Sequence, residues 1–167
     1  FFIGPDVNLN DADLNGADLA STSLIGVKSG SITGLPKLSS AYSIINGYIV
    51  GPGVDLTDAD LTGSVLSGLD LTDVVLTGAT LNGVTSGSVT GIPLLSSPYS
   101  MINGYIFGPN VSLNGIDLTS FDMAGVDLAG ADLTGATLTA ANLSGGAYLY
   151  GASLNGVASG LITGAPA

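Results

Sequence analysis

Leucine recurs at every fifth position along much of the chain, and a small or β-branched residue usually stands two positions before it. The first four central leucines are Leu9, Leu14, Leu19 and Leu24. Neither the 3.6-residue period of an α-helix nor the two-residue period of a flat strand gives this spacing. Positions i−2 and i share one face of an extended segment, but the next leucine would lie on the other face. The chain must therefore turn a corner once per unit, which predicts a β-solenoid with the leucines inside.

The five-residue units fall into three blocks, which we place at 5–26, 53–83 and 110–156 of one continuous repeat array, 1–167. One step, from Leu143 to Leu149, is six residues long, and we interpret the extra residue near Gly145-Gly146 as a β-bulge. The later central positions are Leu56, Leu61, Leu66, Leu71, Leu76 and Leu81, and then Leu113, Leu118, Met123, Leu128, Leu133, Leu138, Leu143, Leu149 and Leu154.

Units such as Ala12-Asp13-Leu14-Asn15-Gly16 resemble those of the pentapeptide-repeat family, in which Ala-Asp-Leu-x-x is typical. The resemblance implies an all-β fold, a right-handed quadrilateral β-solenoid with four pentapeptides per coil. Family members often have Phe as well as Leu at the centre. This chain instead has Phe121 at the inward position two residues before Met123, so we expect that coil to be locally swollen or repacked.

The blocks are separated by two interruptions, 27–52 and 84–109, that match each other along their length. Each contains Asn-Gly between two apolar, β-rich runs, which is the strongest short signal for a β-hairpin. We therefore predict hairpins in which 42–45 pairs with 48–50 and 99–102 pairs with 105–107. We expect Tyr42, Ile44, Tyr48 and Val50 to share one face of the first hairpin, and Tyr99, Met101, Tyr105 and Phe107 one face of the second.

The two chain ends carry parts of the same pattern. Residues 157–167 begin a third interruption, since Ser159–Pro166 matches Ser29–Pro36, and Phe1–Pro5 matches Tyr48–Pro52. Only the equivalent of Leu38–Gly47 is missing between them. Two expectations fit this observation and are compatible. The chain is a piece of a longer array, or it is an assembling protomer whose Phe1, Phe2 and Ile3 pair as a strand with another chain.

Composition narrows the chemistry. The chain has 13 acidic residues, all Asp, only two basic residues, and a net charge of −11, with no His, Cys or Trp. These counts remove thiol and imidazole chemistry and give no reason to expect a cofactor or metal. Nucleic-acid binding needs basic residues that the chain lacks. No run of about 18 apolar residues is present, so we expect no membrane insertion.

Most aspartates occupy the outward position just before the central leucine, and a solvated polar row explains them more simply than catalysis. Successive outward aspartates would ring a coil, one per face, which does not bring two carboxylates together for acid–base work. We therefore predict that the protein is not an enzyme. A loose calcium site at Asp11-x-Asp13 or Asp58-x-Asp60 is a weaker alternative.

The resemblance also implies an alternative function, because some family members mimic B-DNA and inhibit type II topoisomerases. Outward residues twenty apart should stack on neighbouring coils, which places Asp55 against Val75 and Asp122 against Asn142. Because an uncharged residue follows each of these aspartates on the next coil, no continuous acidic track should run along the face. Outward Thr and Asn residues raise ice binding as a third, weaker class. The sequons at Asn110 and Asn142 permit glycan attachment.

The hairpins carry the large apolar and aromatic residues. Packing back on the solenoid as a local cap is the simpler interpretation, and contact between chains is the functional one. On the functional interpretation the protein is a non-enzymatic subunit or fragment of a self-assembling extracellular filament or cell-surface scaffold, with other copies as partners. The candidate assembly residues are Phe1, Phe2, Ile3, Tyr42, Ile44, Tyr48, Val50, Tyr99, Met101, Tyr105 and Phe107.

Overall fold

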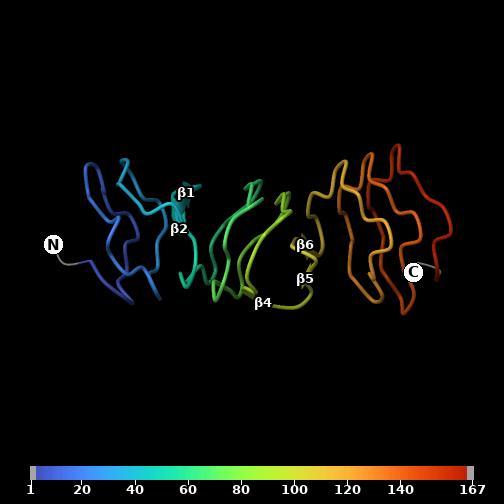
Figure 1. Ribbon diagram of the computed structural model, residues 1–167, viewed down its shortest axis with the longest axis horizontal. Helices are drawn as coiled ribbons and strands as arrows, with labels where there is room; N and C mark the ends of the chain where they lie inside the picture. Colours follow the sequence, from blue (N-terminus) through green and yellow to red (C-terminus); the bar gives the residue numbers. More distant parts are fainter. Residues whose placement is uncertain (1–2, 165–167) are drawn as a thin grey trace.

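The chain forms one elongated stack of coils. The structure is a computed structural model that describes residues 3–164, and the chain advances along the long axis from the N-terminal to the C-terminal end (Figure 1). Within this range no helix is long and apolar enough to cross a membrane.

Each five-residue unit ends in a tight corner. The amide of Ala12 donates to the carbonyl of Leu9 at 3.1 Å, and the same step recurs from Ala17 to Leu14 at 3.0 Å. Many corners have a residue with positive φ just before the donor, as at Asp11 with 58° and Gly63 with 67°. Glycine and short polar residues tolerate that conformation best. The residues between successive leucines are therefore the ones that a tight corner requires.

Parallel backbone pairing stacks one coil on the next. Asp60 bridges to Thr80 and Ser112 bridges to Asp132, and both steps are 20 residues long. The longest such pairing joins β3 (Val75–Leu76) to β4 (Leu94–Leu95) in parallel. Because 20 residues are four units, each coil has four faces. This confirms the predicted quadrilateral solenoid with four pentapeptides per coil.

The leucines line the inside of the coil. Central residues such as Leu24, Leu61 and Leu113 are fully buried, and so is Met123 at its leucine-equivalent position. The inward position two residues earlier holds mostly small side chains, such as Ala131 with no exposed surface. In most units the narrow interior is therefore filled by one large and one small side chain.

Both predicted hairpins form, each with its first strand one residue shorter than expected. In the first, β1 (Ser43–Ile45) pairs antiparallel with β2 (Tyr48–Val50); in the second, β5 (Ser100–Ile102) pairs with β6 (Tyr105–Phe107). The turn residues Asn46 and Gly47 both have positive φ, 49° and 78°, as two-residue hairpin turns of type I′ require.

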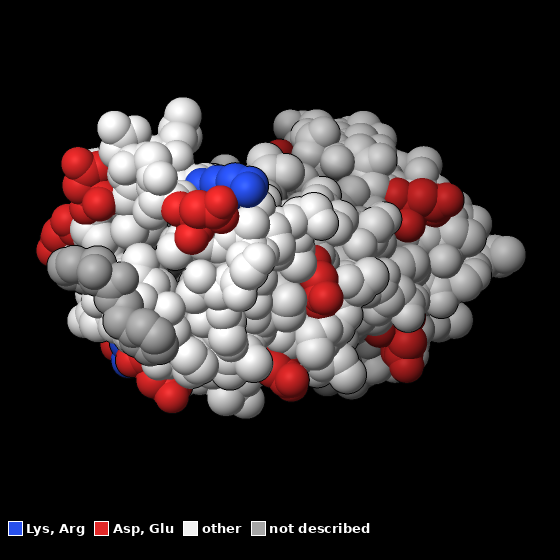
Figure 2. Space-filling view, turned by 60° about the vertical axis from the view of Figure 1, so that its left-hand side comes forward, with Lys and Arg blue, Asp and Glu red and all other residues white. Residues whose placement is uncertain are grey.

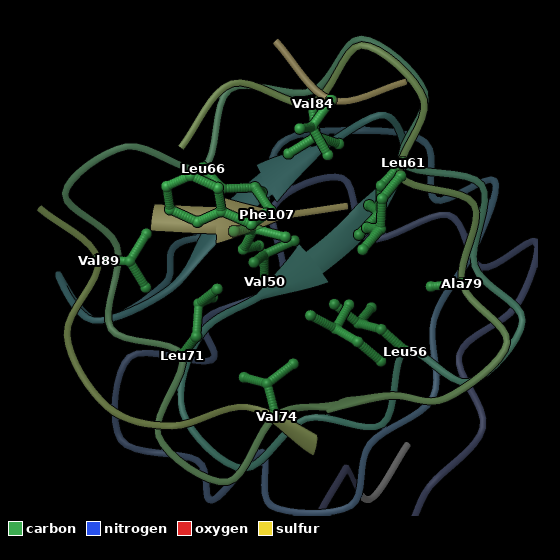
Figure 3. Close-up of a cluster of buried hydrophobic side chains, with 14 of the residues drawn as sticks. Val50, Leu56, Leu61, Leu66, Leu71, Val74, Ala79, Val84, Val89 and Phe107 are labelled. Atoms are coloured by element: carbon green, nitrogen blue, oxygen red, sulfur yellow. The ribbon is translucent and has the colours of Figure 1, made fainter. Parts of the chain in front are cut away.

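The hairpins cross the inside of the solenoid instead of lying on its surface. Figure 3, which looks into the core, shows Val50 and Phe107 in the middle of the outline traced by Leu56, Leu61, Leu66 and Leu71. Side chains in the second strand of each hairpin have no exposed surface: Ile49, Val50, Ile106 and Phe107. Each hairpin is therefore a plate that divides the core between consecutive blocks.

The wall resumes directly after each hairpin. Lys28 bridges to Asp55 and Thr85 bridges to Ser112, and both steps cover 27 residues where an uninterrupted coil uses 20. The rejoining faces differ, because six units after Asp55 carry the chain one and a half turns around the coil. The hairpins consequently leave from opposite sides, with β1 toward the upper edge in Figure 1 and the β4–β5 connection along the lower edge.

The six-residue unit keeps its wall pairing and enlarges its corner. Asp127 bridges to Tyr148 across 21 residues, one more than usual. Gly145 and Gly146 both have positive φ, 68° and 83°, and lie in the turn. The predicted β-bulge is thus a widened corner. Two adjacent glycines allow the extra residue to be accommodated where the backbone already bends.

Candidate functional site

The structure places most of the predicted assembly residues against the core of their own chain. Phe1 and Phe2 lie outside the described residues, and Ile3 is partly buried against the first coil. Val50 and Phe107 are fully buried. The remaining candidates are half-buried and pack on the core: Tyr42, Ile44, Tyr48, Tyr99, Met101 and Tyr105. Contact with another chain through the half-buried residues stays a prediction, whereas Val50 and Phe107 face the inside.

The large hairpin residues do not share one face, contrary to the expectation from the sequence. Ile45 pairs directly with Tyr48, so Ile44 lies opposite Ile49 and Ser43 opposite Val50. Paired residues project to the same side of a hairpin, and therefore Ile44 lies on the face opposite that of Tyr48 and Val50. The same register holds in the second hairpin, where Met101 pairs with Ile106. Both faces are apolar because coils lie on both sides of the plate.

A serine holds each hairpin in place. The hydroxyl of Ser29 accepts the amide of Ile49 at 2.8 Å, and that of Ser86 accepts the amide of Ile106 at the same distance. Both serines are buried and occupy the central position of a unit, where leucine would otherwise stand. The hairpin takes the space of that leucine. Sequence reasoning missed this anchor, although the break in the leucine series was its visible signal.

Tyrosine hydroxyls tie the two ends of the first hairpin together and one of its strands to the wall. Tyr42 donates to the carbonyl of Pro52 at 3.1 Å, and Tyr48 accepts the amide of Asp60 at 3.1 Å. Partial burial, assisted by the charge of Asp70, raises the pKa of the Tyr42 hydroxyl. Burial, assisted by Asp127, likewise raises the pKa of Tyr99. The raised pKa keeps the Tyr42 and Tyr99 hydroxyls protonated at neutral pH, so each can donate a hydrogen bond, to Pro52 and Pro109 respectively.

All thirteen aspartates occupy positions with a structural reason. Four have positive φ in corners or turns: Asp6, Asp11, Asp58 and Asp73. The other nine accept the amide of the residue two positions later through one carboxylate oxygen, as in an Asx turn. They are Asp13, Asp18, Asp55, Asp60, Asp70, Asp117, Asp122, Asp127 and Asp132.

The acidic residues are dispersed over the walls. Asp55 stacks on Val75 and Asp122 on Asn142, as predicted, and among the described residues no bridge pairs two aspartates. Figure 2 shows the acidic side chains of one side in separate groups, with a basic side chain beside one of them. Both lysines pair with aspartates: Lys28 with Asp55 at 3.2 Å and Lys37 with Asp18 at 3.0 Å. No group of three carboxylates that could hold a metal ion occurs within residues 3–164.

The two glycosylation sequons differ in their surroundings. Asn110 is exposed at a corner with a φ of 58°. Asn142 is half-buried within a wall ladder, where its amide donates to Asp122 at 2.8 Å. Asn110 is therefore the more accessible of the two acceptor positions.

Apolar side chains are also exposed at the C-terminal end of the core. A depression of about 330 Å³ lies there, and we name it the C-terminal opening. Its Leu154 keeps 46% of its surface exposed although it is a central leucine, whereas the equivalent Leu24 has none. The opening is lined by Leu138, Leu143, Leu149, Leu154, Val157, Ser159 and Ile162. None of these residues was among the predicted assembly residues.

Comparison with known proteins identifies the class. The family model for pentapeptide repeats matches residues 6–28, 53–85 and 110–145 in eight copies, which is more than half of the chain. The chain belongs to the pentapeptide-repeat family. The fold of this family is a right-handed quadrilateral β-helix, and its members are generally non-enzymatic structural or binding proteins.

Several solved structures are similar to the chain. HetL, a pentapeptide repeat protein involved in heterocyst differentiation regulation from the cyanobacterium Nostoc sp. strain PCC 7120, has 23% identity over 93% of this chain, with a TM-score of 0.31. The match covers 63% of the length of HetL. Rfr23, a pentapeptide repeat protein from the cyanobacterium Cyanothece 51142, has 19% identity over 96% of this chain and 89% of its own, with a TM-score of 0.24.

A third similar structure is QnrB1, a plasmid-mediated fluoroquinolone resistance protein. It has 13% identity over 93% of this chain and 85% of its own, with a TM-score of 0.20. No curated protein matches the chain.

Proposed function

We propose that the protein is a structural β-solenoid that assembles end to end into an extracellular filament or cell-surface scaffold. The observation that carries the proposal is the stacking itself, in which parallel backbone pairing and a continuous apolar core join each coil to the next, as from Asp60 to Thr80 and from Ser112 to Asp132. A solenoid buries its core only by stacking one coil on the next, so an end with exposed leucines is stabilised by a further layer. Leu149 and Leu154 would become more deeply buried under that layer, because both are central leucines with exposed surface.

The roles of the polar side chains support a structural function. The outward carboxylates accept backbone amides within their own units, and the buried Ser29 and Ser86 accept hairpin amides. These interactions hold the coil and the plates together. Walls rich in Gly, Ser and Thr with net negative charge suit an extracellular surface, and the accessible sequon at Asn110 is compatible with that location.

Electron microscopy and analytical ultracentrifugation of the purified chain over a wide concentration range test the proposal. We expect rods longer than one molecule and a weight-average mass that increases with concentration. Leu154→Asp places a charge in the C-terminal opening and should abolish growth. Leu94→Asp is the matched control, because Leu94 is 59% exposed on a side wall and its replacement should leave growth unchanged.

Only discrete monomers at the highest concentration would refute end-to-end assembly. Growth that persists in Leu154→Asp but stops in Leu94→Asp would show instead that the chains associate through their walls.

A further inference from the structure

A polar cleft lies beside the first hairpin, at a corner where two coils separate. On the wall before this corner, Lys28 bridges to Asp55. On the wall after it, the hairpin turn stands between the coils, and the Tyr48 hydroxyl accepts the amide of Asp60 from the following coil at 3.1 Å. The resulting cavity has a volume of about 330 Å³, and we name it the junction cleft. It is lined by 10–11, 28–31 and 57–59, together with Tyr48 and Asp55.

The backbone at this corner lacks a hydrogen bond that the neighbouring layers make. The amide of Asp11 donates to the carbonyl of Gly30 at 2.8 Å, and the corresponding bond recurs one layer further on, from Asp58 at 3.0 Å. Between these two layers, no hydrogen bond joins the amide of Ser31 to the carbonyl of Thr57 within residues 3–164. The inserted hairpin turn therefore leaves a backbone donor and a backbone acceptor facing the junction cleft.

A tyrosine ring and an asparagine amide converge over a bare glycine in the cleft. A β-carbon built on Gly30 would lie 3.2 Å from Cε1 of Tyr48 and 3.4 Å from Oδ1 of Asn10. Gly30 does not have the positive φ that would itself favour glycine. The missing side chain therefore keeps the space between the ring and the amide open, and the half-buried ring of Tyr48 supplies an apolar surface.

The side chains of the junction cleft combine acceptors with donors. The exposed carboxylates of Asp11 and Asp58 line it, and neither forms an ion pair within residues 3–164. The Lys28 ammonium lies 3.2 Å from the carboxylate of Asp55, so these two charges balance each other. A ligand in the cleft therefore meets two unpaired carboxylates, an ammonium group and the backbone amide of Ser31.

The second hairpin has the same opening without the charges. Corner bonds are present in the layers on both sides, from Gly68 and from Gly115 at 2.8 Å each, but none joins Ser88 to Asn114 within residues 3–164. A hairpin junction therefore forms without charged side chains, so the hairpin alone does not explain them at the first junction. The counterparts of Asp11, Lys28, Asp55 and Asp58 are Gly68, Thr85, Ser112 and Gly115.

We propose that the junction cleft binds a saccharide ring, either as a free sugar or as the terminal sugar of a glycan. Every hydroxyl group of a sugar both donates and accepts, which suits carboxylates that lie beside an ammonium and a backbone amide. Asp11 and Asp58 accept from the sugar hydroxyls, Lys28 and Ser31 donate to them, and the apolar face of the ring packs on Tyr48. The inference goes beyond the proposed function, because binding in a side-wall cleft does not require assembly.

Other ligand classes match the junction cleft less well. Its carboxylates repel a phosphate or sulfate group. Residues 3–164 contain no group of three carboxylates suited to a metal ion. An organic amine would satisfy Asp11 and Asp58 but would leave the amide of Ser31 without an acceptor. The amine is therefore the competing outcome that the experiment must distinguish.

NMR with the intact chain tests the proposal. The probes are the methyl glycosides of glucose, galactose, mannose and N-acetylglucosamine. We expect saturation transfer from the protein to the ring protons of at least one of them, with an affinity in the millimolar range. Amide shifts should change at Gly30 and Ser31 and stay constant at Gly87 and Ser88, which makes the second junction an internal control. A glycan array then distinguishes a terminal sugar from a free one.

Variants that copy the second junction sharpen the test. Asp11→Gly combined with Asp58→Gly should keep the fold, because both positions have a positive φ that glycine tolerates. Loss of two charge-assisted hydrogen bonds should weaken binding at least about tenfold. Asp6→Gly combined with Asp73→Gly is the matched control, since it removes the same charge at positive φ outside the cleft. This control should bind like the unchanged protein.

Several outcomes would overturn the proposal. These are no saturation transfer to any glycoside together with no binding on the array, shifts of equal size at both junctions, or equal affinities of the two double variants. Binding of spermidine in place of the glycosides, lost in Asp11→Gly with Asp58→Gly, would identify an organic cation as the ligand instead. Glycoside binding by a chain that stays monomeric would support the cleft and refute only the filament, whereas rods without glycoside binding would do the reverse.

Discussion

The preference for aspartate in the walls has a geometric cause. A carboxylate one bond from Cβ reaches the amide two residues later, as Asp60 does toward Thr62 at 3.0 Å and Asp70 toward Thr72 at 2.9 Å. The longer side chain of glutamate does not favour this local ring, which explains why the nine acidic residues at this wall position are all Asp. The other four aspartates have positive φ, which short polar residues tolerate. The sequence predicted where these carboxylates point, but their hydrogen bonds depend on the backbone bend at each corner.

These hydrogen bonds predict sensitivity to acid. Hydrogen bonds from Thr62 and Thr72 lower the pKa of Asp60 and Asp70, and Thr119 and Thr134 do the same for Asp117 and Asp132. A carboxyl group whose pKa is lower in the folded state stabilises the fold above its unfolded pKa of about 3.9, and this contribution is lost as the pH falls through the folded value. We expect the melting temperature measured by circular dichroism to be level near neutrality and to fall below about pH 4.

Threonine variants provide the control for this pH dependence. Thr62→Val and Thr72→Val together should shrink the acid-induced loss and lower the melting temperature at pH 7. Thr139→Val should leave the profile unchanged, because the residue two positions before Thr139 is Thr137 and not an aspartate. An identical profile in all three proteins would show that these hydrogen bonds do not couple to stability.

The buried serines predict a larger effect. Ser29→Ala leaves the amide of Ile49 buried without its acceptor, which should cost about 1–3 kcal/mol of unfolding free energy in chemical denaturation. Ser86→Ala should have the same effect, because it removes the acceptor of the Ile106 amide. Ser112→Ala, at a wall position, should stay within about 0.5 kcal/mol of the parent. Equal effects at Ser29 and Ser112 would argue against the anchor.

The two hairpins have the same arrangement, and where their side chains differ, the coil that each one contacts differs as well. Asn46 in the first turn donates to the hydroxyl of Ser64 at 2.9 Å. The residue equivalent to Ser64 in the next block is Phe121, whose ring lies 5.9 Å from Tyr105 and 6.1 Å from Phe107. The unusual Phe121 therefore packs against the larger second hairpin. The sequence predicted that this coil is swollen or repacked, but the contact of Phe121 with the hairpin could not be predicted without knowing that the hairpin enters the core.

A double-mutant cycle tests this compensation. Phe107→Val copies the residue at the equivalent Val50, and Phe121→Ser copies Ser64. Each single change should destabilise the protein by about 1–4 kcal/mol, because it leaves a cavity or a polar group in a packed site. The coupling energy between them, measured by chemical denaturation, should be about 0.5–1.5 kcal/mol. Strictly additive effects would show that the rings do not interact energetically.

The sequence determines far more of the wall than of the core plates. The five-residue period, the Asn-Gly turns and the stacking of Asp55 on Val75 are local or strictly periodic, and all are found in the structure. The course of the hairpins through the interior was not predicted, because alternating apolar residues fit a surface cap equally well. The C-terminal opening was not predicted either, because the exposure of its leucines depends on whether a hairpin or another coil covers them.

For the whole molecule, block length sets the direction in which each hairpin leaves. Every unit turns the chain by one face, so the six units between the hairpins rotate the second by half a turn relative to the first. Leu35 and Ile92 occupy equivalent positions beside the two hairpins, and each is at least 80% exposed. They lie on opposite sides of the solenoid, and the chain contains no native cysteine. Fluorophores on Leu35→Cys and Ile92→Cys therefore report the rotation.

Inserting pentapeptides after Thr77 should make energy transfer between these labels oscillate. One added unit moves the second label to an adjacent side, two move it to the same side as the first, and four return it to the opposite side with one extra coil of about 4.8 Å. We expect the highest efficiency for two units and a value for four units slightly below that of the parent. Inserting three residues breaks the corner pattern and should lower the melting temperature sharply. An efficiency that falls steadily with each added unit would contradict a four-sided solenoid, because only rotation can bring the labels closer as the stack lengthens.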